Sequence, residues 1–181
     1  ALPSPVPVLI SMQIASINEE DVLEAAMGVV NAQKSVVDAK NKLSSAASMV
    51  RKAEKKVSQS EGRVAQVRAR IMKKEMRVDS VNVDITTTLA RLEEIEELLA
   101  ELDNSPNTTR TSRETVKLRG EQSRALEKHV KMTLALANLE SALSSDRLDL
   151  ADRLATYNNN LAAVVDSRAN ENLCRTNCKN A

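Results

Sequence analysis

Hydrophobic residues return every seven positions along the N-terminal half of this chain. The first series has twelve members and no interruption: Val22, Val29, Val36, Leu43, Val50, Val57, Val64, Ile71, Val78, Ile85, Leu92 and Leu99. A second series follows three residues later: Ala25, Ala32, Ala39, Ala46, Ala53, Ser60, Val67, Lys74, Val81, Thr88, Ile95 and Leu102. Only Lys74 places a charged residue in this second series. Such a repeat is typical of a coiled-coil helix. It predicts one helix over 17–102, on the order of 120 Å long at about 1.5 Å per residue.

The start and the weakest point of this helix are both visible in the sequence. Ser16 and Glu19 have the spacing of a capping box, and the acidic residues that follow suit the positive end of the helix dipole. The stretch Ser58–Gly62 has the lowest helix propensity, so we expect any bend there. Residues 1–15 contain three spaced prolines and are interpreted as an extended arm.

A cluster of turn-forming residues around Pro106 predicts a tip loop over 103–112. The loop contains the triplet Asn107-Thr108-Thr109, which is an N-glycosylation sequon. Asn107 is therefore a candidate glycosylation site if the chain is secreted. The alternative is a solvated turn without a glycan.

A return helix is predicted over 113–168. Its hydrophobic residues form heptad series whose main members are Leu118, Ala125, Met132, Leu136, Leu139, Leu143, Leu150, Tyr157 and Val164. The step from Leu139 and Leu143 to Leu150 and Leu154 spans eleven residues, which predicts a stutter where the supercoil unwinds. Residues 169–181 are interpreted as a polar, cysteine-bearing tail.

Charge matching predicts that the two helices run antiparallel. If the chain reverses at the loop, the acidic run Glu93–Glu101 faces the basic residues between Arg113 and Arg124, and the basic stretch Arg51–Arg77 faces the acidic region Glu140–Asp152. Opposite charges that face each other along two helices help to select the register of the pair. The predicted fold is all-α, an elongated antiparallel helical bundle or coiled coil built on two long helices as a single domain over 1–181, with a third, shorter helix left open.

The return helix is shorter than the first, so we expect two to three N-terminal turns of the first helix to be uncovered. Three occupants are possible for the apolar residues there, which include Val22, Val29 and Val30. They are the arm 1–15, a third helix, or another protomer.

Composition mainly excludes classes of function. The 181 residues are 42% hydrophobic but only 1% aromatic, with no Phe or Trp, so the core must consist of many small contacts along helices. The net charge of +1 gives no general attraction to nucleic acid, and there are no aromatic platforms for bases. The apolar runs are too short to span a bilayer.

Catalytic or metal-binding chemistry is not apparent. His129 is the only histidine and lies on the inner face of the predicted return helix without convergent partners. The basic residues Arg68, Arg70, Lys73, Lys74 and Arg77 could bind a polyanion, but their spacing favours a solvated, ion-paired face. We therefore predict a non-enzyme with no cofactor, no metal and no small-molecule substrate.

Cys174 and Cys178 are the only cysteines. Their spacing fits neither a zinc site nor a redox CxxC motif. Helical positions i and i+4 place Cα atoms roughly 6 Å apart, within disulfide range. We expect one local disulfide in an oxidising compartment, with two free thiols on a frayed tail as the alternative.

The Ala-rich, aromatic-poor heptad pattern, the turn-rich tip and the cysteine-bearing C-terminus together resemble the stage-specific surface coat glycoproteins of trypanosomes. In particular, they resemble the glutamic acid and alanine-rich protein family. The resemblance covers the whole chain in composition and architecture and contains no diagnostic motif. It implies an elongated helical bundle at the cell surface, extracellular and lipid-anchored to the plasma membrane through a signal outside this chain.

The function implied by the resemblance is a major surface glycoprotein. It would form a dense protective coat on the insect-stage parasite by lateral packing with copies of itself, with the C-terminal end at the membrane. Two alternatives stay open. One is a helical-bundle receptor for a host ligand, whose candidate patch is the stutter at Leu143–Leu150. The other is an intracellular coiled-coil scaffold or spacer.

Overall fold

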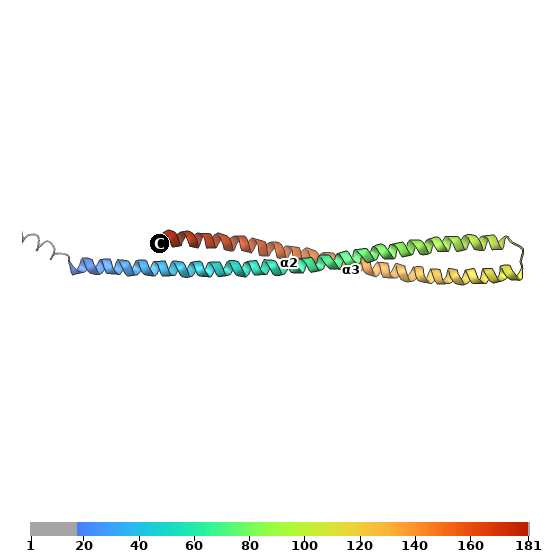
Figure 1. The fold of residues 1–181 in the computed structure, drawn as a ribbon, viewed down its shortest axis with the longest axis horizontal. Coiled ribbons are helices and arrows are strands. Elements are labelled where there is room, and N and C mark those ends of the chain that lie inside the picture. The colour runs from blue at the N-terminus through green and yellow to red at the C-terminus, as the bar shows by residue number, and fades with distance from the viewer. Residues whose placement is uncertain (1–17, 181) are drawn as a thin grey trace, which may run out of the picture. The chain divides into compact units, whose positions relative to one another are not determined.

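The computed structural model of the chain describes residues 18–180 and is all-α, as predicted (Figure 1). Its elements are two antiparallel helices, α2 (Glu19–Asp103) and α3 (Thr109–Asn180). The third, shorter helix that the sequence left open is not found within the described range. The predicted arm 1–15 and the cap at Ser16 lie outside the described residues.

Helix α2 is one unbroken helix of 85 residues, close to the predicted 17–102. At its start, the carbonyl of Asn18 accepts hydrogen bonds from the amides of Asp21 at 3.0 Å and Val22 at 3.3 Å. At its end, the Asn104 side chain donates to the Ala100 carbonyl at 3.0 Å, and the Ser105 hydroxyl donates to the Glu101 carbonyl at 2.8 Å. These bonds satisfy the last carbonyls of the helix just before Pro106, which cannot continue it.

The loop is shorter than predicted and covers only 104–108 instead of 103–112. Helix α3 begins at Thr109 because Thr108 and Thr111 cap it reciprocally. The Thr111 amide donates to the Thr108 hydroxyl at 3.2 Å, and the Thr108 amide donates to the Thr111 hydroxyl at 2.8 Å. This is the arrangement of a capping box, with threonine in place of glutamate at the third position.

The predicted end of the return helix at 168 and the polar tail 169–181 are wrong, because α3 continues as helix to Asn180. The reason is a heptad repeat that contains many polar members. Two series are buried or half-buried throughout. The first is Thr111, Leu118, Ala125, Met132, Leu139, Asp146, Arg153, Asn160, Ser167 and Cys174, and the second is Thr115, Gln122, His129, Leu136, Leu143, Leu150, Tyr157, Val164, Glu171 and Cys178.

The predicted stutter is also wrong, because both series keep their seven-residue phase through Asp146 and Arg153. Leu143 is buried and Leu150 is packed against the core cluster around it. This stretch is therefore part of the contact between the helices. Of the patch named for the receptor alternative, Leu143 and Leu150 thus lie in this contact, whereas Leu148 is 71% exposed.

Contacts divide the described chain into two compact units, and α2 and α3 contribute to both. Unit 1 comprises 18–58 and 159–180, and its buried residues are Ala46, Val50, Ala53 and Val164. Unit 2 comprises Gln59–Asn158. The boundary in α2 falls after Ser58, within the predicted weak stretch Ser58–Gly62, yet the helix is continuous there.

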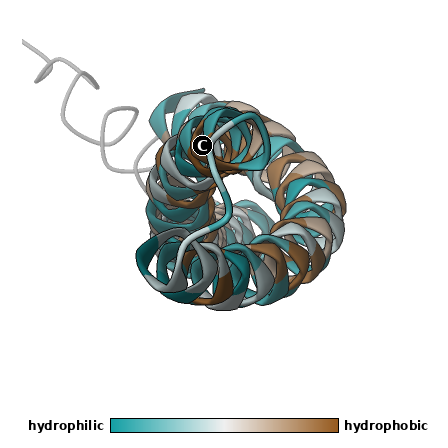
Figure 2. Cartoon of the chain, turned by 90° about the vertical axis from the view of Figure 1, so that its right-hand side faces the viewer, coloured by the Kyte–Doolittle hydropathy of each residue, from teal (hydrophilic) through white to brown (hydrophobic). Residues whose placement is uncertain are grey.

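Unit 2 holds most of the buried side chains. They are Ser60, Val64, Val67, Ile71, Thr88, Leu92, Ile95 and Leu143. All but Leu143 belong to the two predicted series of α2, so the seven-residue pattern correctly identified the inner face. Figure 2 shows how hydrophobic and hydrophilic residues alternate around each helix, as expected when only one stripe is buried.

Ile95 is the largest of the fully buried side chains, with 1% of its surface exposed. We expect Ile95→Ala to lower the free energy of unfolding by about 2 to 5 kcal/mol, because it removes buried methyl groups and leaves a cavity. Urea unfolding followed by far-UV circular dichroism measures this change. Met76→Ala, at a side chain 67% exposed on the same helix, is the control and should change stability by less than about 0.5 kcal/mol. Equal effects of the two variants would contradict the assigned core.

Candidate functional site

Two irregularities in the heptad patterns meet in unit 2. Lys74 interrupts the second series of α2, and Asp146 occupies an inner position of α3. The Lys74 Nζ lies 2.8 Å from Asp146 Oδ2 and donates a hydrogen bond to the Ala142 carbonyl at 3.4 Å. The side chains are 31% and 13% exposed. They form a polar layer between the helices. In the sequence, the two residues are only separate interruptions of apolar series.

Arginine side chains extend this polar layer toward the surface. Arg70 Nη2 lies 3.6 Å from Asp146 and 2.8 Å from Asp149, and Asp149 also pairs with Arg153 at 2.9 Å. Beside them, Arg147 of α3 pairs with Glu75 of α2 at 3.1 Å. Arg70 and Lys74 belong to the basic stretch that was a polyanion candidate. Their pairing with carboxylates on α3 supports the ion-paired interpretation.

The polar layer lowers the pKa of Asp146 below its ordinary value. The hydrogen bond from Lys74 is the largest cause, and the positive charges of Lys74 and Arg70 act in the same direction. Desolvation opposes the shift but does not cancel it. Asp146 is therefore a carboxylate held in its charged form by contacts that exist only in the folded chain.

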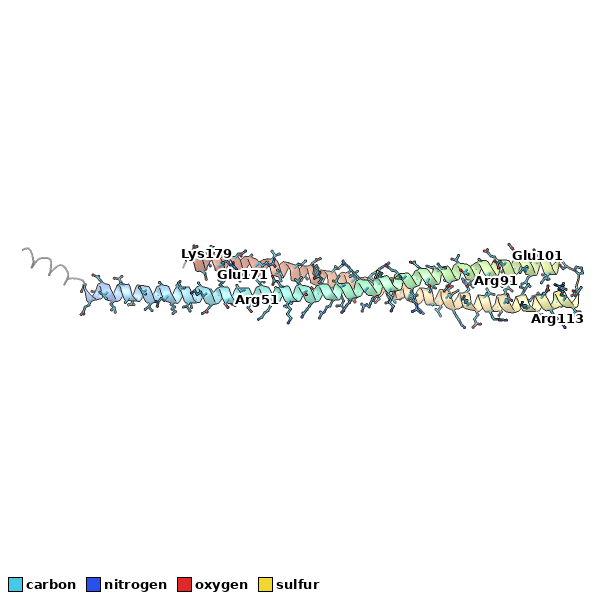
Figure 3. The ribbon with its side chains drawn as sticks, in the orientation of Figure 1. Arg51, Arg91, Glu101, Arg113, Glu171 and Lys179 are labelled. Carbon is cyan, nitrogen blue, oxygen red and sulfur yellow. The ribbon has the colours of Figure 1, made fainter. Side chains whose placement is uncertain are left out.

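Other pairs confirm that the helices are antiparallel in each unit. In unit 1, Arg168 pairs with Glu54 at 2.8 Å, and the Asn160 side chain donates to the Lys56 carbonyl at 3.4 Å. Near the loop of unit 2, Arg91 of α2, which is labelled in Figure 3, pairs with Glu121 of α3 at 2.9 Å. The expected pairing near the loop had acidic residues on α2 and basic residues on α3, so this pair has the opposite polarity.

The N-terminal segment of α2 is the main apolar surface left without cover among the described residues. All of 19–35, which we call the uncovered segment, is exposed. Its five large apolar side chains, Val22, Leu23, Met27, Val29 and Val30, are between 57% and 63% exposed. This is nearly five turns, more than the two to three that were expected.

The same face of α2 becomes covered further along the helix. Val36 and Ala39 are half-buried, whereas Ala46, Val50 and Ala53 are buried. An open hollow of about 440 Å³ marks the transition. Asn31, Lys34 and Lys42 line it from α2, and Cys174 and Asn177 line it from α3.

Cys174 and Cys178 are free thiols in the structure, so the predicted disulfide is not formed there. They do not lie on a frayed tail. Both are half-buried in helix α3, where each continues one of its two heptad series. Their thiols thus occupy the positions that small hydrophobic side chains hold elsewhere in the contact between the helices.

Asn107 lies exposed in the loop, as predicted, and its side-chain oxygen accepts a hydrogen bond from Ser112 at 3.1 Å. His129 lies half-buried on the inner face of α3, also as predicted, and its Nδ1 has no hydrogen-bond partner in the described structure. Neither residue is part of a convergent set of reactive groups. Among residues 18–180, no three side chains of His, Cys, Asp or Glu gather in a way that could hold a metal ion.

Neither α2 nor α3 has a stretch long and apolar enough to cross a membrane within the described residues. Comparison of the chain with protein-family models, curated proteins and solved structures finds no match.

Removing one charge of the polar layer should lower stability, whereas replacing both charges by apolar side chains should not. We expect Lys74→Met and Asp146→Leu to lower the urea midpoint when made singly, because each leaves one charge in the contact between the helices without its partner. The double variant should be at least as stable as the wild type, since it completes the hydrophobic repeat. A double variant less stable than both single variants would show that the layer is not a matched pair.

The pKa of Asp146 also predicts a dependence of stability on pH. Its folded-state pKa lies below the ordinary value of 3.8, so its contribution is present above about pH 4 and is lost as pH falls through the depressed folded-state pKa. The difference in urea midpoint between wild type and Asp146→Asn should be constant from about pH 7 to 5 and shrink in more acidic buffer. Asp79→Asn, which removes an exposed carboxylate from α2, is the control and should change the free energy of unfolding at pH 7 by less than about 0.5 kcal/mol.

Proposed function

We propose that this protein is a structural, non-enzymatic helical hairpin that assembles with copies of itself. The uncovered segment 19–35 is the observation that carries this proposal. It exposes five large apolar side chains on a helix whose later turns are covered by α3. A contiguous apolar surface of this kind marks a site of interaction.

The placement of the charged side chains supports a structural role. Those of the polar layer pair α2 with α3, and Glu54–Arg168 and Arg91–Glu121 do the same elsewhere along the helices. Such pairs select one register and orientation of two helices. The charged side chains of these pairs are therefore engaged in holding α2 against α3.

The first setting for such a hairpin is the surface coat of an insect-stage trypanosome, as the resemblance of the sequence implies. In that setting the protein is a glycoprotein, lipid-anchored at its C-terminal end, and copies stand side by side and screen the membrane. The exposed Asn107 in the loop supports it, because a glycan there would meet no steric obstacle. Near-neutral net charge also permits dense lateral packing.

The second setting is a coiled-coil scaffold or spacer, in which copies pair without a membrane. The uncovered segment favours this setting, since its apolar residues continue the heptad repeat that already holds α2 against α3. A coiled-coil seam that extends beyond its intramolecular partner has the pattern required to pair with another helix.

Cells that make the protein distinguish the two settings. If the protein is a coat glycoprotein, a phospholipase specific for phosphatidylinositol anchors should release it from intact cells. A peptide N-glycosidase should then reduce its mass, and Asn107→Gln should remove this mass change. Asn104→Gln in the same loop lies outside the sequon and should leave it intact. A protein that the phospholipase does not release and the glycosidase does not change would contradict the coat and leave the scaffold.

A further inference from the structure

We propose that the uncovered segment of α2 binds the same segment of a second copy, antiparallel and about a two-fold axis at Met27. The inference rests on the proposed self-assembly and specifies its surface, its orientation and its register. Three features of the described residues support it, namely the continuity of the heptad seam, the small residues near the axis, and the distribution of charge.

The first feature is continuity with an interface that already exists. Val22, Ala25, Val29 and Ala32 belong to the same two series of α2 that α3 covers from Val36 onward. In unit 1 burial on this face begins at Val36 and Ala39, and the hollow lined by Cys174 and Asn177 marks where α3 ends. A second α2 running antiparallel takes the same direction as α3. It can therefore lie along the same face of α2 directly beyond α3.

The heptad phase selects one register for this pairing. In antiparallel coiled coils, a member of one series packs against a member of the other series across the interface. An overlap that spans 19–35 in both copies places Val22 opposite Ala32 of the second copy and Ala25 opposite Val29. Two-fold symmetry repeats both contacts. Each layer then contains one valine and one alanine, so the layers have equal volume and the backbones approach evenly.

Small residues lie where the two helices would come closest. Ala25, Ala26 and Gly28 flank Met27, the residue at the proposed axis. A Cβ added to Gly28 would meet no atom within 4 Å, so packing inside the single chain does not require glycine there. Glycine and alanine at these positions leave room for the backbone of a second helix to approach.

Charge favours the antiparallel orientation over the parallel one. The first turns of α2 carry Glu19, Glu20, Asp21 and Glu24, whereas Lys34 lies at the other end of the uncovered segment and Lys179 in the last turn of α3. An antiparallel pair brings each acidic end to the basic end of the other copy. It also places the start of α2 after the end of α3, so that the helix dipoles align head to tail. A parallel pair would instead bring the two acidic ends together.

Sedimentation velocity of the whole chain, from about 1 to about 300 µM, tests the inference. We expect the wild type to form dimers as concentration rises, with a modest affinity because the interface is short. Val29→Lys should raise the dissociation constant at least about tenfold, because it places a charge in a central layer. Val83→Lys is the matched control: Val83 is 65% exposed on the same helix but outside the uncovered segment, so this variant should dimerise like the wild type.

Cysteine crosslinking in a Cys174→Ser/Cys178→Ser background tests the orientation. If the pair is antiparallel, a mixture of copies carrying Val22→Cys or Ala32→Cys should form a disulfide between the two variants. Val22→Cys alone should form little, since its two thiols would lie about three turns apart. Efficient crosslinking of Val22→Cys with itself would show a parallel pair and overturn the proposed register.

The outcomes separate this inference from the proposed function. If wild type and Val29→Lys dimerise equally, another surface joins the copies, so self-assembly stands and this inference fails. If the chain is monomeric throughout, both the proposed self-assembly and this inference fail. An antiparallel pair turns the copies in opposite directions, so a dimer that responds to Val29→Lys favours the scaffold over copies tethered side by side on one membrane.

Discussion

The ion pair between Lys74 and Asp146 fixes how α2 and α3 lie against each other in unit 2. A purely hydrophobic heptad seam permits slippage by whole heptads at little cost, because each layer resembles the next. A lysine in that seam is tolerated only in the register that supplies a carboxylate, and Asp146 supplies it at 2.8 Å. Arg70 and Asp149 strengthen the same register from the surface side. The buried core around Val67, Ile71 and Leu143 then packs beside this layer.

The extent of the uncovered segment follows from the phase of α3. Once Asp146 is recognised as an inner residue, the two series of α3 run without a break to Cys174 and Cys178. The cysteines are then inner positions near the end of α3, and 19–35 of α2 has no counterpart on α3. The exposed Val22 and Val29 are thus members of a regular seam whose intramolecular partner has ended, and not isolated surface hydrophobics.

The seven-residue pattern predicted the bounds and inner face of α2 well and those of α3 less well, for a physical reason. Along α2 nearly every inner position is aliphatic, alanine or a small hydroxyl residue, so hydrophobic periodicity and burial coincide. Along α3 the inner positions include polar residues. Asp146 and Asn160 have partners on α2, whereas Arg153 and Glu171 pair within α3 and bury their aliphatic stems. A pattern that counts only apolar residues therefore loses the phase at Asp146 and ends the helix too early. An uncovered apolar surface at the start of α2 could be predicted. Its length could not, because that length depends on where α3 ends.

The scarcity of aromatic residues fits both settings proposed for the protein, yet the two settings use it differently. In a coat, small side chains keep each hairpin slender, so many copies fit on a given area of membrane. In a scaffold, the same small side chains let a second helix approach Ala25 and Gly28 closely, where a ring would hold it away. The change from acidic residues at Glu19 to a basic residue at Lys34 has no consequence for a coat. In a scaffold, it favours one relative direction of two paired α2 helices. In the proposed dimer, the acidic start of α2 therefore favours copies that point in opposite directions.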